Sequence, residues 1–228
     1  AHSFDTAARV SSDRGCITLI GIEPTFPSTG FGYIQRDGVI DARAGVYNVE
    51  SFKEKPNYDT AKQYVESGNY LWNCGYFVGS VDVFMNEMKR SAPDLWSNYQ
   101  TLASVAEFGG EEYNRTYLEL DNQVIDIALI EKAAELAVVS ADFDWMDIGN
   151  FKDLHNAVAK DENDNYVRGE NIHTIDIDNT YIRNEQPDKP VAVIGLDNVV
   201  VVNTPDGVLV ARRDVAAKCG DIAKKLQA

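Results

Sequence analysis

The hydrophobic pattern of the chain changes near residue 160, from long stripes and runs to short, evenly spaced strands. Residues 16–22 form a continuous apolar run of strand length. Such a run is typical of a strand that is buried on both faces, as in a parallel sheet covered by helices. Residues 4–14 are amphipathic and predict a helix that leads into this central strand.

The stretch from residue 23 to residue 160 indicates further strands and helices of an α/β fold. Gly68 is a C-cap candidate for one helix, and Asn150 is an N-cap candidate for another. A less regular segment is expected at 113–120. The predicted elements are a hairpin at 39–52, strands at 70–78 and 137–140, and helices at 58–67, 80–88, 93–108, 126–137 and 150–158.

After residue 160 the pattern is typical of a small β-rich domain. Turn residues such as 178–179 and 204–207 separate short apolar stretches. Evenly spaced short strands suggest a small sheet or a coiled β-helix. We therefore predict two domains, 1–160 and 161–228. The predicted strands of the second are 172–177, 180–182, 191–194, 199–202 and 207–210, followed by a helix at 214–227.

The charge of the chain narrows the classes of partner. Its 36 acidic and 21 basic residues give a formal net charge of −15. No basic stripe is present, which argues against nucleic-acid binding through phosphates. An anionic substrate would have to be held by a few local cations, helix N-termini or a metal. We expect no membrane segment, because no apolar run approaches the roughly 18 residues of a membrane helix.

Cysteine and histidine usage argues against disulfides and zinc. The three cysteines are odd in number and far apart, which suits a reducing compartment and predicts a cytoplasmic protein. The three histidines have no ligand-like spacing, so a zinc site is not expected. These residues are Cys16, Cys74 and Cys219, and His2, His155 and His173.

A charged triplet, Glu54-Lys55-Pro56, follows a predicted strand. Adjacent side chains of a strand point to opposite faces, and Pro56 should stop strand pairing because it lacks a backbone donor. Lys55 could then reach a phosphate as a point charge, while Glu54 accepts from sugar hydroxyls. The alternative, from these three residues alone, is an ion pair on a surface hairpin.

A second candidate lies in the aromatic-rich strand at 70–78. Asn73 and Gly75 are two residues apart and share a face. An amide among flat aromatic walls is a typical way to hold a polyol, and the alternative is a buried asparagine that is satisfied within the core. Gly32 stands between aromatic residues, where a ligand could approach the backbone, although a bulge or turn explains it equally well.

Two aspartates complete the candidate set. Asp147 follows a predicted strand and precedes a helix, and ligands of parallel α/β sheets bind outside the carboxyl ends of strands. A carboxylate there can coordinate Mg²⁺, which takes oxygen ligands and usually bridges to substrate phosphates. The alternatives are a local turn or cap for Asp147 and a helix N-cap for Asp126.

Six motifs occur in an order that resembles the mannose-1-phosphate guanylyltransferases, within the sugar-nucleotide pyrophosphorylases. The resemblance runs nearly from end to end. The motifs are LIGIEPT at 19–25 with STGFGYI at 28–34, FKEKP at 52–56, WNCGYF at 72–77, IDIALIEK at 125–132, FDWMDIG at 143–149 and VVVNTPDGVLV at 200–210.

The resemblance implies an α/β fold in which a partial nucleotidyltransferase (Rossmann-like) mixed sheet, flanked by helices, is followed by a β-helix-like appendage. It implies transfer of GMP from GTP to mannose 1-phosphate, giving GDP-mannose and pyrophosphate, with Mg²⁺ as cofactor and a homodimer as the assembly. Lys55 and Asp147 would be catalytic, with Lys55 on the sugar phosphate and Asp147 as one of two metal aspartates. The implied substrate-binding residues are Gly32, Tyr33, Glu54, Lys55, Asn73, Gly75 and Asp126.

The nucleotide-binding half of the family pattern has no counterpart in these residues. We find no glycine-rich loop with its following lysine, and no segment that carries the second metal aspartate. We therefore expect this polypeptide alone to lack guanylyltransferase activity, and its parallel sheet to expose an edge. The alternative functions are a non-catalytic sugar-phosphate-binding or regulatory homologue, and a nucleotidyltransferase for another hexose 1-phosphate.

Overall fold

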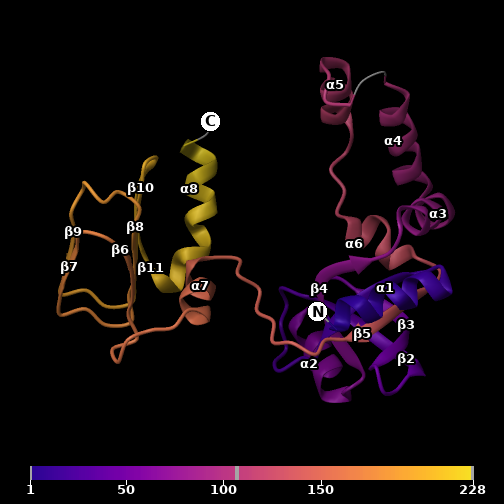
Figure 1. The fold of residues 1–228 in the computed structure, drawn as a ribbon, viewed down its shortest axis with the longest axis horizontal. Helices are drawn as coiled ribbons and strands as arrows, with labels where there is room; N and C mark the ends of the chain where they lie inside the picture. Colours follow the sequence, from indigo (N-terminus) through magenta and orange to yellow (C-terminus); the bar gives the residue numbers. More distant parts are fainter. Residues whose placement is uncertain (1, 106–107, 227–228) are drawn as a thin grey trace. The chain divides into compact units, whose positions relative to one another are not determined.

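The computed structural model describes residues 2–105 and 108–226, which form two compact units (Figure 1). The units are Ala1–Trp145 and Met146–Ala228, so contacts place residues 146–160 with the second unit, whereas composition suggested the first. Residues 106–107 of the predicted helix 93–108, and residue 227 of the predicted helix 214–227, lie outside the described ranges. Within those ranges no helix is both long and apolar enough to cross a bilayer.

Five strands of the first unit form a closed barrel in the order β1-β4-β2-β3-β5. β1 runs parallel to β5, and all other neighbours are antiparallel, which confirms the predicted mixed sheet. Our prediction that the sheet exposes an edge is wrong for these strands. The β2–β3 hairpin pairs with β4 on one side and with β5 on the other, and this closes the barrel. The strands are β1 (Ile17–Ile22), β2 (Gly32–Asp41), β3 (Val46–Lys53), β4 (Tyr70–Val78) and β5 (Leu136–Ser140).

β1 is buried along most of its length because it lies between two hydrophobic clusters. Ile17 and Leu19 belong to one cluster, together with Val138 of β5. Ile20 belongs to the other, together with Val10 of α1 (His2–Arg14). Successive side chains of a strand reach opposite faces, so coverage of both faces accounts for the continuous apolar run.

Local capping sets the ends of several helices. Asn57 accepts a hydrogen bond from Thr60 N at the start of α2 (Tyr58–Ser67), and Gly68 ends this helix in a left-handed conformation, as predicted. Ser80 caps α3 (Val81–Ser91) in the same way. The segment that we expected to be less regular is instead helical, as α5 (Glu111–Glu119), which contacts α4 (Pro93–Ser104) (Figure 1).

The predicted helix at 126–137 is wrong beyond its first turns. The chain forms the short helix α6 (Ile125–Ala128) and the 3-10 turn η1 (Ile130–Lys132), and it is extended again in β5. The buried carboxylate of Glu87 accepts a hydrogen bond from Ala134 N at 2.9 Å, a donor that a continuous helix would use internally. Tertiary contacts therefore override the helical periodicity of this stretch.

The second unit is a small coiled β structure with helices before and after its strands. One sheet has the order β11-β10-β8-β6, and a second pairs β7 with β9 in parallel. This arrangement confirms the predicted β-helix-like part and adds β6, which we did not predict. The elements are α7 (Phe151–Ala157), β6 (Tyr166–Gly169), β7 (Ile172–Ile175), β8 (Tyr181–Asn184), β9 (Val191–Ile194), β10 (Val199–Thr204), β11 (Gly207–Arg212), η2 (Arg213–Lys218) and α8 (Cys219–Leu226).

The coils turn at residues that tolerate a left-handed backbone. Asp176 and Gly195 follow paired strand ends, and both have positive φ. Asn179 and Asn198 follow a bridge between the same two coils and also have positive φ. Asn, Asp and Gly adopt this conformation at the lowest cost, so the sequence repeats these types where the coil repeats its corner.

Buried asparagines connect the coils from inside. Asn203 Nδ2 donates to Asn184 Oδ1 at 2.9 Å. Asn184 Nδ2 in turn donates to the carbonyl oxygens of Glu170 and Lys189, at 2.8 and 3.0 Å. A buried amide is unfavourable unless it is hydrogen-bonded, so these bonds favour one register of the coils.

Candidate functional site

The end of β3 brings Glu54 and Lys55 together. Lys55 has a left-handed backbone, with φ of 44°, which is unfavourable for a residue other than glycine. Lys55 Nζ consequently lies 3.2 Å from Glu54 Oε1, and our expectation that these side chains point to opposite faces is wrong. The Lys55 side chain is still 62% exposed, so its ammonium group can reach a ligand. Backbone strain of this kind clusters at functional sites.

The Glu54 carboxylate packs closely against Gly32 of β2. Its Oε2 is buried and has no hydrogen-bond partner among the residues that the structure describes. A Cβ on Gly32 would lie 2.5 Å from that oxygen, so a larger residue at this position would require the Glu54 carboxylate to move. Buried carboxylate oxygens are normally hydrogen-bonded, so within the described residues Oε2 keeps an unused acceptor next to Gly32.

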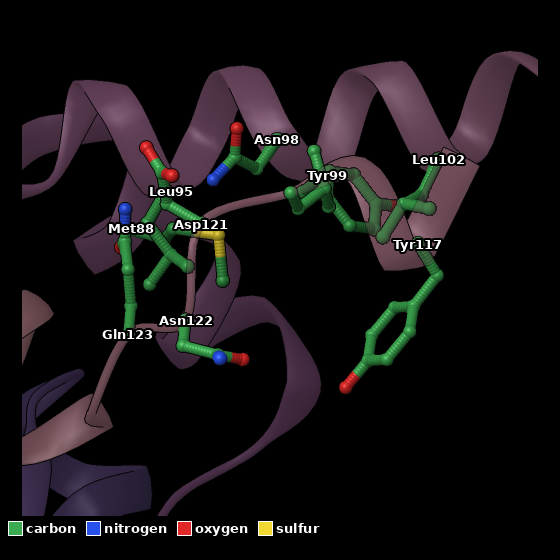
Figure 2. A pocket seen from close by; sticks show the side chains of 10 residues that line it. Met88, Leu95, Asn98, Tyr99, Leu102, Tyr117, Asp121, Asn122 and Gln123 are labelled. Carbon is green, nitrogen blue, oxygen red and sulfur yellow. The ribbon is translucent and has the colours of Figure 1, made fainter. Parts of the chain in front are cut away.

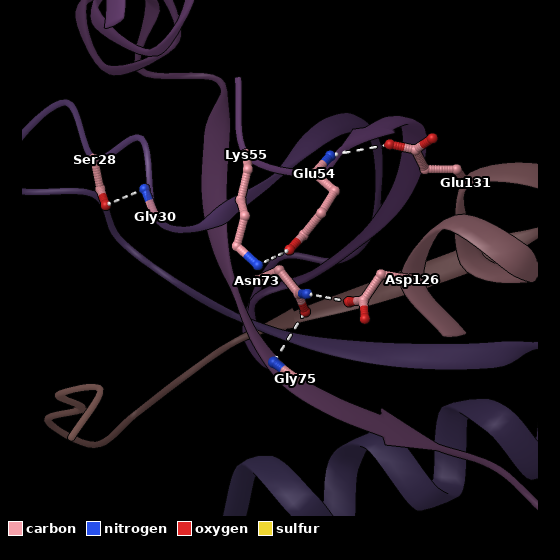
Figure 3. Close-up of polar contacts among 8 residues, drawn as sticks. All are labelled: Ser28, Gly30, Glu54, Lys55, Asn73, Gly75, Asp126 and Glu131. Atoms are coloured by element: carbon pink, nitrogen blue, oxygen red, sulfur yellow. Dashed lines mark hydrogen bonds and ion pairs between the residues drawn. The ribbon is translucent and has the colours of Figure 1, made fainter. Parts of the chain in front are cut away.

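Asn73 links two elements of the site (Figure 3). Its Nδ2 donates to Asp126 Oδ1 at 2.8 Å, and its Oδ1 accepts from Gly75 N at 3.0 Å. The amide is therefore buried and satisfied within the protein, as the core-asparagine alternative expected. Gly75 has a φ of 76° and lies where the pairing of β4 with β1 is irregular, so it takes a conformation that favours glycine.

Asp126 lies in the first turn of α6 and is not its N-cap, because Val124 occupies that position. Tyr33 is fully buried, and its hydroxyl accepts from Ser28 N and donates to Ser28 O, each at 3.0 Å. Through these two bonds it holds the loop before β2. Sugar contacts by Tyr33, Asn73 and Asp126 stay predictions.

Four aromatic side chains, among them Trp72 and Phe31, pack against one another. The rings of Phe26 and Phe31 lie 4.8 and 5.1 Å from the ring of Trp72, and Phe31 lies 5.4 Å from Trp145. The Trp72 indole N–H is buried and has no acceptor among the described residues. Trp72 lies in the same buried cluster as Tyr33, and Phe31 packs against that cluster, so these two rings contribute to the core of the first unit.

Two residues that we did not single out also contact the site. Glu131 Oε1 accepts from Glu54 N at 3.0 Å (Figure 3). The same oxygen lies 3.7 Å from Lys53 Nζ. Lys53 lies in the motif at 52–56 and Glu131 in the motif at 125–132. Their place in these motifs is the sequence signal that could have identified them. Nothing local in the sequence indicates that these two segments meet.

Cys74 is a poor candidate for covalent chemistry at neutral pH. Burial raises the pKa of its thiol to about 11. Its Sγ lies 3.1 Å from the carbonyl oxygen of Ile20 and donates to it. The thiolate is the reactive form of cysteine, so this residue has a structural role in β4.

Asp147 belongs to the second unit, whereas the other predicted site residues belong to the first. Its side chain is exposed, and Asn150 caps α7 shortly after it by accepting from Lys152 N and Asp153 N. The predicted N-cap at Asn150 is thus confirmed. The metal role of Asp147 stays a prediction.

A pocket of about 270 Å³ lies apart from these residues, against α4 and α5 (Figure 2). Leu95, Tyr99 and Tyr117 supply apolar surface, and Asn98 and Asp121 supply polar groups. Its lining includes no lysine or arginine. A phosphate needs a cation or a helix N-terminus, so the Glu54–Lys55 region is the better candidate for an anionic ligand.

Comparison with known proteins gives two family matches. The Nucleotidyl transferase model matches residues 2–164, and the MannoseP isomerase/GMP-like beta-helix domain model matches residues 169–226. The chain is 35% identical over 219 residues to a mannose-1-phosphate guanylyltransferase from Klebsiella pneumoniae, covering 92% of this chain and 46% of the relative. It is 36% identical over 228 residues to a putative mannose-1-phosphate guanylyltransferase from Vibrio cholerae, covering 97% and 47%.

A solved structure supports the same assignment. The crystal structure of mannose-1-phosphate geranyltransferase from Thermus thermophilus matches with a TM-score of 0.79 and 29% sequence identity, over 99% of this chain and 64% of that chain. The chain spans about half the length of the curated relatives that it matches. Because the first family model covers well over half of its residues, the chain belongs to the Nucleotidyl transferase family.

Proposed function

We propose that this chain supplies the sugar-phosphate side of a mannose-1-phosphate guanylyltransferase. The observation that carries the proposal is an exposed ammonium group, on Lys55, paired with a Glu54 carboxylate whose second oxygen is buried and unpartnered among the described residues. A cation next to a hydrogen-bond acceptor suits a ligand that joins a phosphate to hydroxyl groups. The names of the relatives support mannose 1-phosphate as this ligand.

Each residue has a distinct part in the proposed reaction. Lys55 holds the phosphate of mannose 1-phosphate and offsets its charge, and Glu54 accepts hydrogen bonds from the sugar hydroxyls. Asn73 orients the Asp126 carboxylate at the sugar. An oxygen of the sugar phosphate attacks the α-phosphorus of GTP in line, and pyrophosphate leaves. Positioning and charge neutralisation drive such a reaction, since it needs no covalent intermediate with the protein.

Mg²⁺, when bound, would neutralise charge on the reacting phosphates. Asp147 is the proposed ligand, and its exposed carboxylate has the oxygen donors that this ion prefers. Over residues 2–105 and 108–226, no group of three His, Cys, Asp or Glu side chains could hold a metal by itself. A single carboxylate fits an ion that is bound mainly by substrate phosphates and water.

Isothermal titration calorimetry with mannose 1-phosphate tests the proposal. We expect wild-type protein to bind it, and Lys55→Ala to bind at least tenfold more weakly, because a charge-assisted contact contributes about 1.5–3 kcal/mol. Lys62→Ala is the matched control, since Lys62 is similarly exposed on α2 and pairs with Glu66. Absence of wild-type binding, or equal binding by Lys55→Ala, would contradict the proposal.

The same titration separates an enzyme from a binding or regulatory homologue. Binding that Mg²⁺ strengthens supports nucleotidyl transfer. Binding that Mg²⁺ does not affect supports the non-catalytic alternative. Glucose 1-phosphate in place of mannose 1-phosphate tests the choice of hexose.

A further inference from the structure

Glu131 contacts the main chain of the proposed phosphate-binding turn. Its Oε1 accepts a hydrogen bond from Glu54 N at 3.0 Å. Its side chain is only 24% exposed, and its other polar neighbour is Lys53 Nζ, at 3.7 Å. Glu131 therefore acts on the residue that carries the unpartnered carboxylate oxygen.

The segment that carries Glu131 is fixed on both sides of it. Before Glu131, Asp126 accepts from Asn73 of β4 at 2.8 Å. After it, Ala134 N donates to the buried carboxylate of Glu87, on α3, at 2.9 Å. With both flanks held, Glu131 Oε1 is kept at the Glu54 amide at little further cost in conformational entropy.

The backbone that Glu131 contacts needs such support. Lys55 has a left-handed conformation, which is unfavourable for a residue with a Cβ. If the turn relaxed to an extended strand, adjacent side chains would point to opposite faces. The Lys55 ammonium would then leave the Glu54 carboxylate, which it now meets at 3.2 Å.

We propose that Glu131 is a positioning residue, which fixes the Glu54 main chain so that Glu54 and Lys55 stay on the same side of the strand end. This inference rests on the proposed function, in which Glu54 takes the sugar and Lys55 takes the phosphate. The role needs a hydrogen-bond acceptor at the place of Glu131 Oε1. It does not need a negative charge.

Three substitutions distinguish an acceptor from a charge. Glu131→Gln keeps a carbonyl oxygen at the same distance from the backbone, so mannose 1-phosphate should bind within about twofold of wild type. Glu131→Asp keeps the charge, but its side chain is one methylene shorter, so its oxygens lie farther from Glu54 N. Glu131→Ala removes the carboxylate oxygens. Both should weaken binding by about tenfold, as expected for one hydrogen bond that orients two ligand-binding groups.

Glu135→Ala is the matched control. Glu135 is a carboxylate of the same segment, but it is half exposed and pairs with Arg14 on α1. Its removal should leave binding unchanged. Thermal melting of each variant shows whether lost affinity accompanies lost folding, and the comparison of Gln with Asp decides the question if Glu131→Ala does not fold.

The outcomes separate the two proposals. If wild-type protein does not bind mannose 1-phosphate, the proposed function fails. If wild type binds and Lys55→Ala does not, but folded Glu131→Asp and Glu131→Ala bind like wild type, the positioning role of Glu131 is overturned. Weakening by Glu131→Gln as large as that by Glu131→Ala would also overturn it, because binding would then be lost although a hydrogen-bond acceptor is kept.

Discussion

Gly32→Ala offers the sharpest test of the contact between β2 and the Glu54 carboxylate. An alanine Cβ at this position would lie 2.5 Å from Glu54 Oε2, whereas ordinary contact begins at 3.4 Å. The carboxylate would have to move by about 0.9 Å. Its flexible end can swing away, while Phe52 and Asn73, at 3.1 and 3.2 Å, need to move by only a few tenths of an ångström.

The two consequences should differ in size. Overpacking of a fitted site costs about 1–3 kcal/mol, and relaxation of a flexible side chain favours the lower end of this range for the stability of Gly32→Ala. In the proposed function, displacement of Glu54 Oε2 removes a charged acceptor from the sugar, which contributes about 1.5–3 kcal/mol. The dissociation constant for mannose 1-phosphate should therefore rise by about 10- to 150-fold.

Calorimetry and thermal denaturation of Gly32→Ala measure these two quantities. Gly38→Ala is the control, because Gly38 lies on the same strand and its added Cβ would meet nothing closer than 3.6 Å. It should bind and melt like wild type. A folded Gly32→Ala protein with wild-type affinity would refute the role given to the Glu54 carboxylate.

Three further predictions separate function from stability. Lys55→Gly relieves the left-handed backbone at this position, so the free energy of unfolding should stay within about 1 kcal/mol of wild type while mannose 1-phosphate binding weakens at least tenfold. Asn184→Ala removes the buried amide that bonds the coils and should destabilise the second unit by about 2–4 kcal/mol in urea denaturation, without affecting binding. Burial, assisted by the nearby Arg213 charge, lowers the pKa of His155, so its neutral form stabilises the fold above about pH 6.5 and this stability is lost as the pH falls through the lowered pKa. Melting temperatures of His155→Gln should consequently fall less between pH 7 and pH 5 than those of wild type.

Elements with local signals could be predicted from the sequence. The strand at 70–78 and the helix at 58–67 were predicted at their observed bounds, and Gly68 caps the helix as expected. The signal at Gly68 is local, because a left-handed helix end favours glycine whatever the rest of the fold does.

Elements that depend on distant contacts could not be predicted. The apolar residues at 126–137 do recur with helical spacing. However, Ala134 N donates a hydrogen bond to Glu87, and the residues from Leu136 onward form β5. The closure of the barrel likewise depends on pairing between β3 and β5, which are far apart in the chain. Hydrophobic periodicity carries no information about either contact.

The candidate site shows the same limit. Locally, Glu54 and Asn73 resembled a surface ion pair and a core amide, and the order of six motifs gave them a functional interpretation. The structure adds what neither source contained, namely that Asn73 meets Asp126 and that Glu131 meets the Glu54 amide. These contacts join segments separated by tens of residues, so only the folded chain reveals them.

A crystal structure of the protein with mannose 1-phosphate would test the central claim most directly. We predict electron density for the phosphate within ion-pair distance of Lys55 Nζ, and a sugar hydroxyl that donates to Glu54 Oε2, the oxygen that has no partner among the described residues. A sugar phosphate bound elsewhere, with Glu54 Oε2 and Lys55 Nζ unchanged, would contradict it.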